Sequence, residues 1–433
     1  MDPIWIGVCG IGVMIVGLLA SVPVAAALGI VSLVGMATIA GWQGALGMIA
    51  VASFNEATSY DFAAVALYIA IGAIAIECGM ADFLFDALTK WFSRVRGGLM
   101  IATTMAAAFF GACSGSSIAS CALFGKLAVP KMIKGGYDPS LATGCVAASG
   151  TLAVLIPPSG MLILYGILTQ QSIGHLFMAG LLPGIINALL YCFGMYGISV
   201  IKPHLVPPSE SFSLSERLSA SRKAWPAPVI GIFIILSLYF GIATPTEIAG
   251  VGAFFCIVTA VAFTGLRGAR LPQAMVETAR QSAMILLIVI GAKMFGRFLA
   301  VSQVAPWLVN AIEATGLSKG WVMFLLIVMY GIMGCIVDAL AMAVVSIPIV
   351  FPLVTALGFD PIWFGVILVQ MVEIAVMTPP MGMNVFVTKS VVGDLASFGQ
   401  VFRGTCIFLT ADIILLALML LFPQIVLFLP GRM

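Results

Sequence analysis

Long uncharged apolar runs constrain the fold of this chain more than any other feature. Residues 97–125, 141–168 and 176–201 each contain no Asp, Glu, Lys or Arg. A helix that crosses the hydrocarbon core of a bilayer needs about 20 apolar residues. Hydrophobic residues occupy 62% of the 433 positions and charged residues 8%, whereas soluble domains carry roughly 25% charged residues. The alternating pattern of a membrane β-barrel is absent, so we predict an all-α polytopic membrane protein.

Composition excludes several classes of function. A net charge of +2 gives no basic surface for nucleic acid, and the two histidines, His175 and His204, lie far apart without an HExxH metal motif. The nine cysteines form no CxxC pair, and most lie in apolar runs, where cysteine is a small packing residue. The first seven residues lack the basic segment of a signal peptide, so we expect them to belong to a retained span.

The distribution of positive charge predicts the topology. Lys and Arg gather in four clusters, at residues 90–96, 126–134, 202–223 and 267–280. Because positive charge is enriched in cytoplasmic loops, we place all four clusters on the cytoplasmic side. Two pairs of apolar runs then cross the membrane outward and back, residues 141–168 with 176–201 and residues 229–241 with 248–263.

The segment between the first two clusters is too short for two spans. Residues 97–125 number 29, both ends are assigned to the cytoplasm, and two full spans need about 40 residues. We therefore expect a re-entrant hairpin of two half-length helices that turns at Ser114, Gly115 and Ser116. Non-helical backbone at membrane depth is tolerated where it is buried in protein or lines an aqueous cavity. The alternative is one helix whose small residues allow close packing.

An internal repeat predicts two broken helices. Residues 130–160 align with residues 352–382 at a constant offset of 222, with nine identities in 31 positions. Each copy contains a Gly-aromatic-Asp-Pro helix start, in which the aspartate caps a helix and the proline takes its first position. Each copy then reaches a Pro-Pro-x-Gly sequence, at Pro157 and at Pro379. Because consecutive prolines interrupt a helix, each copy predicts a discontinuous membrane helix.

The repeat also predicts a second hairpin. At the same offset, residues 112–116 correspond to 334–338, so residues 331–352 should form a hairpin with its tip between Gly334 and Asp338. Its downstream flank carries no charge, whereas the first copy has three lysines there. With one span at residues 283–300 between the fourth cluster and this hairpin, the second hairpin would enter from the outside. Paired broken helices in two inverted repeats are typical of secondary transporters.

The motifs, taken in order, resemble those of a known family. GACSGSSIA, VPKMIKGGYDP, LIPPSGMLILYG, LFMAGLLPG, GIATPTEIAG, MGCIVDALA and EIAVMTPPMGMNVF are similar to the large membrane subunit of tripartite ATP-independent periplasmic (TRAP) transporters. The resemblance runs from about Pro23 to the C-terminal span. Two positions depart from the family pattern: Ser120 stands where the family often has aspartate, and residues 61–77 lack a proline that the family often has. These departures bear on the substrate more than on the mechanism.

The resemblance implies a function and partners. It implies sodium-coupled secondary uptake by an elevator mechanism in the bacterial inner membrane, with Na⁺ as the coupling ion and no enzymatic activity. A small four-helix membrane subunit would bind one-to-one. A periplasmic substrate-binding protein would deliver a small organic anion, such as sialic acid, a dicarboxylate, another carboxylate or a sulfonate. The alternative among transporters is a self-sufficient sodium/dicarboxylate-type symporter.

The same resemblance implies a division of the chain into scaffold and transport parts. Residues 1–96 would form N-terminal scaffold helices and residues 202–318 scaffold and connecting helices. Residues 97–201 and 319–396 would form the first and second inverted repeats of the transport domain, each with a hairpin and a broken helix. Residues 397–433 would form the C-terminal helix.

The resemblance also implies which residues bind. Sodium prefers oxygen ligands, which hairpin tips and broken helices supply. The first sodium site would use Ser114, Gly115, Ser116, Ser117, Gly150, Thr151 and Pro157, and the second Gly334, Ile336, Asp338, Thr378, Pro379 and Gly382. The substrate would contact Ser116, Ser117, Ser159 and Asn384. The alternative is that the serines only cap half-helices, and that Asn384 is a helix cap.

Ionisable residues at membrane depth are candidates for function. We expect Asp338 to contact sodium directly or through a neighbour. Glu373 is either functional or a hydrogen-bond partner that links helices. Lys293 and Arg297 either reach the substrate anion or, as we favour, extend toward the membrane surface or pair with scaffold carboxylates.

Two other classes of protein fit the sequence less well. A membrane-embedded enzyme would need HExxH, a GxGD pair or a Ser–His dyad near the first tip, and the sequence has none of these. A channel would not need paired broken helices.

Overall fold

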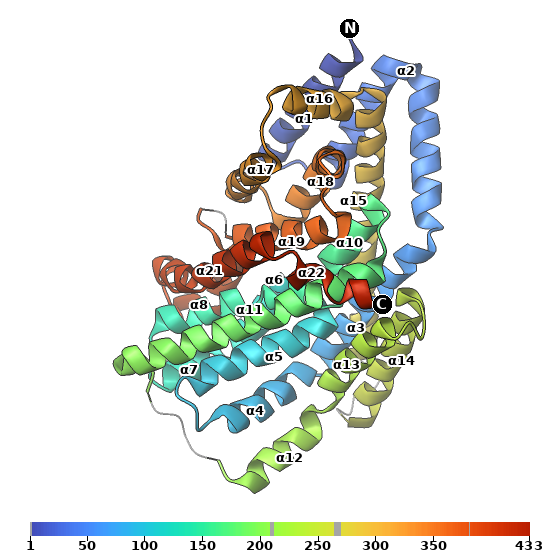
Figure 1. The fold of residues 1–433 in the computed structure, drawn as a ribbon. Helices are drawn as coiled ribbons and strands as arrows, with labels where there is room; N and C mark the ends of the chain where they lie inside the picture. The colour runs from blue at the N-terminus through green and yellow to red at the C-terminus, as the bar shows by residue number, and fades with distance from the viewer. Residues whose placement is uncertain (1, 208–211, 264–269, 381) are drawn as a thin grey trace.

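The computed structural model describes residues 2–207, 212–263, 270–380 and 382–433, and these contain helices and no strand. Eight helices or helix groups are long and apolar enough to cross a membrane, with a ninth possible if the bent pair Leu214–Ala224 and Pro226–Tyr239 is one span. The predicted all-α polytopic fold is therefore confirmed (Figure 1). Arg267, the first cation of the fourth predicted cluster, lies outside the described residues.

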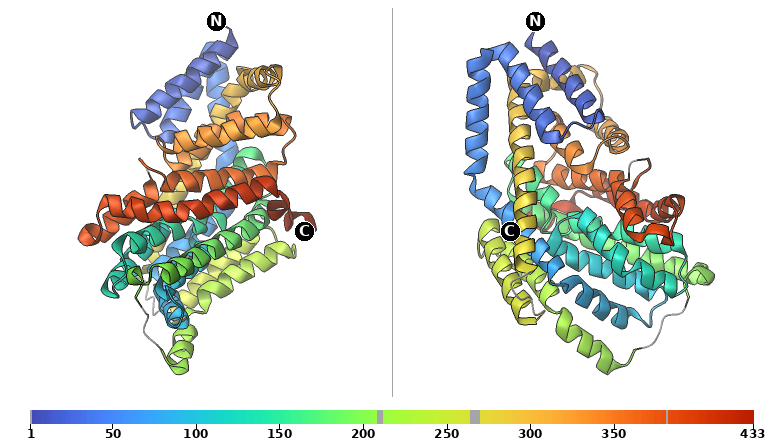
Figure 2. Two further views of the ribbon diagram at one scale, coloured as in Figure 1. Left: turned by 60° about the vertical axis from the view of Figure 1, so that its left-hand side comes forward. Right: turned by 180° about the vertical axis from the view of Figure 1, so that it is seen from behind.

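Two long helices form one side of the molecule. Helix α2 (Val24–Ala57) changes direction at Gly41, where φ is 75° and ψ is 168°, a conformation that glycine adopts readily. Both arms of α2 pack on α15 (Arg270–Val301), since Gly291 approaches Ala25 before the turn and Met294 packs with Met48 after it. The sequence analysis did not predict this turn. Figure 2 shows α2 and α15 side by side in its right-hand view.

The first repeat has the predicted elements. Helices α5 (Gly98–Ser114) and α6 (Ser117–Leu127) form a hairpin, and α7 (Val129–Lys134) follows. Helix α8 (Pro139–Ser149) begins with Asp138 as its cap and Pro139 in its first turn. The broken helix continues as α9 (Leu152–Leu155) and, after the Pro157–Pro158 cis peptide, as α10 (Gly160–Thr169). The helix is thus interrupted twice, at residues 150–151 and 156–159.

The second repeat matches the first. Helices α17 (Lys319–Gly334) and α18 (Ala339–Ala356) form the second hairpin. Helix α19 (Pro361–Met377), capped by Asp360, ends before the Pro379–Pro380 cis peptide, and α20 (Met383–Val392) follows. Unlike its counterpart, α19 has no early interruption.

Two further helices pack against the broken helices. Helix α11 (Ile173–Ile201) packs on α5, α10 and α19, and α21 (Phe398–Leu421) packs on α8, α11 and α19. The α8–α21 contact is close because glycines face each other: a Cβ on Gly144 would lie 2.3 Å from the carbonyl carbon of Gly404. Helices α1 (Pro3–Leu19) and α16 (Val304–Ala314) lie at the opposite end from α12 in Figure 1.

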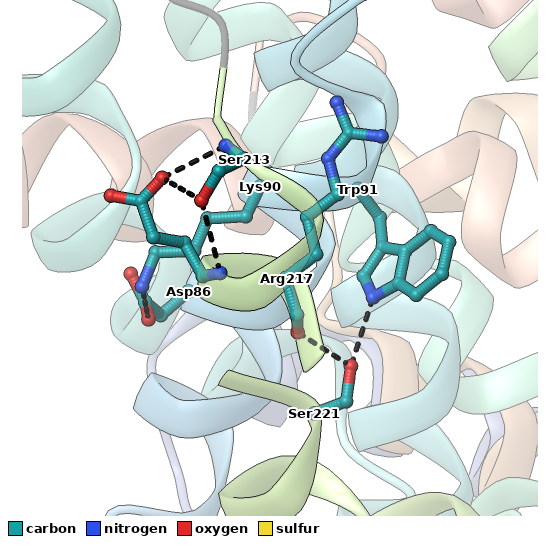
Figure 3. A network of polar contacts seen from close by, with 7 residues as sticks. Asp86, Lys90, Trp91, Ser213, Arg217 and Ser221 are labelled. Atoms are coloured by element: carbon teal, nitrogen blue, oxygen red, sulfur yellow. Dashed lines mark hydrogen bonds and ion pairs between the residues drawn. The ribbon is translucent and has the colours of Figure 1, made fainter. Parts of the chain in front are cut away.

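The described cationic clusters gather around α4 (Met80–Phe92). Helix α12 (Leu214–Ala224) packs on it, and the Trp91 Nε1 donates to Ser221 Oγ at 2.8 Å (Figure 3). Arg217 donates to Ser93 Oγ at 3.4 Å, and Lys131 lies over the Phe85 ring. From the fourth cluster, Arg270 donates to the Glu77 carbonyl at the end of α3 (Tyr60–Glu77). This grouping fits the placement of all four clusters on one side of the membrane.

Three helices remain. Helices α13 (Pro226–Tyr239) and α14 (Pro245–Phe263) follow α12, and α22 (Gln424–Leu427) lies near the C-terminus.

Candidate cation and substrate site

The tip of the first hairpin lies directly on the break of the first broken helix. Gly115 has φ 59° and connects α5 to α6. A Cβ at Gly115 would lie 2.9 Å from the Pro158 carbonyl oxygen and 3.1 Å from the Gly160 nitrogen. Glycine is therefore required twice here, for its positive φ and for the close approach of two backbones. The same tip reaches the earlier interruption, since a Cβ at Gly150 would lie 3.0 Å from the Ser117 carbonyl oxygen.

The polar groups at this tip include one with no partner. The Ser114 Oγ is buried and makes no hydrogen bond. Ser116 accepts from the Ala119 amide at 3.3 Å and so caps α6, and Ser159 accepts from Leu162 at 3.2 Å and caps α10. Ser116 and Ser159 therefore do cap half-helices, but a cap that accepts one bond keeps a second lone pair. Buried hydroxyls are normally hydrogen-bonded. The Ser114 hydroxyl has no partner, so its oxygen is free to bind a cation.

Helix ends give this region both signs of partial charge. The C-termini of α5, α8 and α9 end at Ser114, Ser149 and Leu155, where the last carbonyls lack helical partners and favour a cation. The N-termini of α6 and α10 begin at Ser117 and Gly160 and favour an anion. One tip thus combines a cation-favouring and an anion-favouring arrangement.

Thr151 and Pro157 contribute less through their side chains than the sequence suggested. The Thr151 hydroxyl donates to the Ala148 carbonyl at 2.7 Å and lies 3.3 Å from the Tyr191 hydroxyl. Its hydroxyl is therefore already partnered within the helix bundle, so only its backbone could serve the predicted cation site. Pro157 is buried directly before the Pro158 carbonyl that Gly115 approaches.

The second tip meets the second break in a related way. A Cβ at Gly334 would lie 2.1 Å from the Cβ of Ala375, and a Cβ at Gly111 would lie 2.9 Å from that of Ala153. Ala153 and Ala375 are equivalent at the repeat offset of 222. The Cys335 thiol donates to the Pro379 carbonyl at 3.3 Å. Each hairpin therefore packs on the corresponding part of its own broken helix.

The predicted ligands at the second tip are more exposed than those at the first. Asp338 accepts from the amides of Leu340 at 2.9 Å and Ala341 at 3.0 Å, so its carboxylate caps α18 while remaining exposed. Ile336 is also exposed and offers only its backbone. Thr378 donates to the Ile374 carbonyl, and its own carbonyl accepts from the Gly382 amide at 3.0 Å.

A cavity separates this tip from the N-terminal helices. Its volume is about 360 Å³. One wall is the α1–α2 connection, and the other comprises the second tip and the start of α20. The lining residues are Leu18, Ser21, Val22, Pro23, Val24, Gly334, Ile336, Val337, Asp338, Ala341, Val376 and Met383. Asp338 therefore lines a cavity between the second hairpin and the helices predicted as scaffold.

Asn384 occupies a buried position between the two broken helices. Its Nδ2 on α20 donates to the Ala147 carbonyl of α8 at 3.3 Å, while its Oδ1 is buried without a partner. A fully buried amide with an unused oxygen is suited to bind a donor on a ligand. The helix-cap alternative is not observed, because no hydrogen bond from Asn384 to its own helix is present in the described part of α20.

Lys293 pairs with Glu56, a carboxylate of the part predicted as scaffold, as we favoured. Its Nζ lies 3.9 Å from Glu56 Oε1 and donates at 2.7 Å to the Ile167 carbonyl in the last turn of α10. A cation at a helix C-terminus is favourable. Lys293 thus connects α15 and α2 to the first broken helix. Arg297 is exposed on the same helix.

Sequence reasoning missed a buried carboxylate in α21. Asp412 is fully buried and accepts from Asn187 at 2.8 Å, Tyr191 at 2.7 Å and Gln370 at 3.2 Å. Because Tyr191 also touches Thr151, this network connects the C-terminal helix to the first break. The available signal was a single aspartate in an otherwise apolar run, outside the repeat on which the analysis concentrated.

Comparisons with known proteins agree with this architecture. A family model described as "Tripartite ATP-independent periplasmic transporter, DctM component" matches residues 11–425. The C4-dicarboxylate TRAP transporter large permease protein DctM of Pseudomonas aeruginosa is 32% identical over 386 residues, which cover 88% of this chain and 89% of that protein. The isethionate TRAP transporter permease protein DctMQ of Oleidesulfovibrio alaskensis is 31% identical over 375 residues. These residues cover 86% of this chain and 59% of that longer protein.

A solved structure shares the fold. The YdaH transporter of Alcanivorax borkumensis superposes with a TM-score of 0.60, at 14% identity, over 89% of this chain and 90% of that chain. The relatives are permeases, and the described helices include enough candidate spans for an integral protein of the inner membrane. With a family model that matches nearly the whole length, the chain belongs to the DctM family of large membrane subunits of tripartite ATP-independent periplasmic transporters.

Proposed function

We propose that this subunit uses a sodium gradient to take up a small organic anion, a carboxylate or a sulfonate. A periplasmic substrate-binding protein delivers the anion, and a small four-helix membrane subunit completes the complex. The two hairpins and two broken helices, residues 97–201 and 319–396, form the hairpin unit. This unit moves as an elevator against the remaining helices.

The contact between the first tip and its break supports the sodium site most strongly. The orphan Ser114 hydroxyl, the Pro158 carbonyl beside Gly115 and the Ser117 carbonyl beside Gly150 place hard oxygen donors in one buried region. Three helix C-termini add negative partial charge there. At the second tip, Asp338 and the carbonyls of residues 334–336 and 378–379 provide a second set. We assign one sodium ion to each tip.

The anion is recognised by helix N-termini and by neutral polar groups. The N-termini of α6 and α10, with Ser116, Ser117 and Ser159, favour a carboxylate or sulfonate group. Asn384 offers its free Oδ1 to a hydroxyl or amine of the substrate. The N-terminus of α18 is less suitable, because the Asp338 carboxylate already occupies it. Relatives named for C4-dicarboxylates and for isethionate both match this chain at similar identity, which supports the broader class of substrate.

Within the described residues, a single side-chain hydrogen bond joins the hairpin unit to α2 and α15, from Lys293 to the Ile167 carbonyl, and this scarcity of polar links supports the elevator. The rest of the contact is side-chain packing; for example, a Cβ added to Gly296 on α15 would lie 3.8 Å from the Pro348 Cβ on α18. The cavity at Asp338 separates the second tip from the α1–α2 connection. Sliding along α15 therefore breaks this hydrogen bond and exchanges packing contacts.

Uptake into proteoliposomes tests the proposal. The chain is reconstituted with the small subunit and the binding protein encoded beside it, and a radiolabelled C4-dicarboxylate and isethionate are supplied with an inward sodium gradient. We expect saturable uptake that needs sodium and both partners. Robust uptake by the chain alone would favour the self-sufficient symporter, and a flux that neither saturates nor needs sodium would favour a channel.

A further inference from the structure

Two buried carboxylates lie on neighbouring helices in the protein interior. Glu373 on α19 is 2% exposed and Asp412 on α21 is fully buried. Gln370, about one helical turn before Glu373 on α19, donates to Asp412 Oδ1 at 3.2 Å, which places the two carboxylates near each other. Neither takes part in an ion pair within the described residues. Two buried carboxylates at close range cannot both be ionised without a large electrostatic penalty.

The surroundings of Asp412 suit the ionised form. Three donors, from Asn187, Tyr191 and Gln370, reach its two oxygens at 2.7 to 3.2 Å. Hydrogen bonds to a charged carboxylate are stronger than those between neutral groups and favour the charged form. Asp412 therefore holds the negative charge of the pair.

The surroundings of Glu373 suit the neutral form. Its Oε2 is buried without a hydrogen-bond partner, although an ionised oxygen in this position would require a donor. A proton on this carboxyl removes the charge that burial without a donor would otherwise leave uncompensated.

No cation on the neighbouring helices can replace this proton. The helices packed against α19 in the described chain are α9, α10, α11, α17, α18, α20, α21 and α22. Of their basic groups, His175, Lys319 and Arg403 are exposed, and the Lys389 Nζ donates to the Gly393 carbonyl. Their other titratable groups, apart from Asp412, are phenols and thiols: Tyr165, Tyr191, Cys192, Tyr196, Tyr330 and Cys406.

We propose that Glu373 is a proton-binding site that holds one proton in the buried core around α19, separately from the ions at the hairpin tips. The proton comes from water and occupies the Glu373 carboxyl, while Asp412 stays ionised. Loss of this proton would leave an unpaired charge in the core around the second broken helix.

Infrared difference spectroscopy on the full chain in lipid bilayers tests the site. With ¹³C-labelled glutamate, wild-type protein at neutral pH should show a protonated carboxyl band that carries the isotope shift and moves again in deuterated water. The Glu373→Gln variant should lose this band. The exposed Glu313→Gln variant is the matched control and should keep it.

The outcomes separate a proton from a sodium ion. If wild-type protein shows no protonated glutamate band at neutral pH, the proposal is wrong. If the band is absent in sodium but appears in choline, Glu373 binds sodium in place of the proton and the proposal is equally wrong. Because wild-type labelling alone answers both questions, the test holds even if Glu373→Gln fails to fold.

Discussion

Replacement of Gly115 by alanine tests whether the first tip and its break bind one ion together. The added methyl group would lie 2.9 Å from the Pro158 carbonyl oxygen and 3.1 Å from the Gly160 nitrogen. Both are backbone atoms, which cannot rotate away as a side chain can. The tip and the break must therefore separate, and any ligands they share must move apart.

The expected cost has two parts. An L-residue at a φ of 59° costs about 1–2 kcal/mol, and overpacking adds about 1–3 kcal/mol. The second part should appear in ion binding, because it pushes apart the two sides of the site. A cost of about 1–3 kcal/mol corresponds to a rise of about 5-fold to 150-fold in the sodium concentration that gives half-maximal uptake.

Gly241→Ala is the matched control. Gly241 has a φ of 61° and no atom within 4 Å of an added Cβ, so it carries the conformational cost without the contact. Both variants should unfold at lower temperature than wild type by fluorescence, but only Gly115→Ala should shift the sodium titration. If both variants keep the wild-type sodium dependence, the tip and the break do not share an ion and our first site is wrong.

Three further predictions concern the tips and the topology. Ser116→Ala should raise the half-maximal sodium concentration by a few-fold and destabilise α6, because a lost cap costs about 1 kcal/mol; an unchanged sodium titration would make Ser116 a cap only. Asp338→Asn should keep the α18 cap, since asparagine caps equally well, yet raise the sodium requirement more strongly because a charge is lost. The apparent substrate affinity of Asp338→Asn should recover at high sodium. If high sodium restored only the maximal rate of uptake, this prediction would be wrong. In a background without reactive native cysteines, Lys131→Cys should react with an impermeant maleimide only from the cytoplasm and Leu353→Cys only from outside; labelling of both from one side would refute the inverted topology.

The elements of the two repeats could be predicted because their signals are local. Asp-Pro starts and Pro-Pro-x-Gly breaks act through the backbone of the same few residues, so Asp138 and Asp360 cap the expected helices. The turn at Gly41 has no such signal, since nothing in an apolar run separates a packing glycine from one with positive φ.

The polar interior could not be predicted for a different reason. The partners of Asp412 lie 42 to 225 positions away, on α11 and α19, and the partner of Lys293 is a backbone carbonyl of α10. Such contacts depend on how helices pack, which hydropathy does not specify. The sequence therefore indicated which residues are costly to bury but not which of them meet.

A disulfide trap tests the moving unit most directly. Cysteines at Gly296 and Pro348 would join α15 to the second hairpin, with an expected Cβ separation of about 3.8 Å, which suits a disulfide. Cysteines at Gly17 and Ala27, at about 3.9 Å, would join α1 to α2 within the predicted scaffold and form the matched control. Oxidation should abolish sodium-driven uptake in the first pair, with recovery after reduction, and leave the second pair active. Full uptake by a completely cross-linked Gly296–Pro348 pair would contradict the elevator.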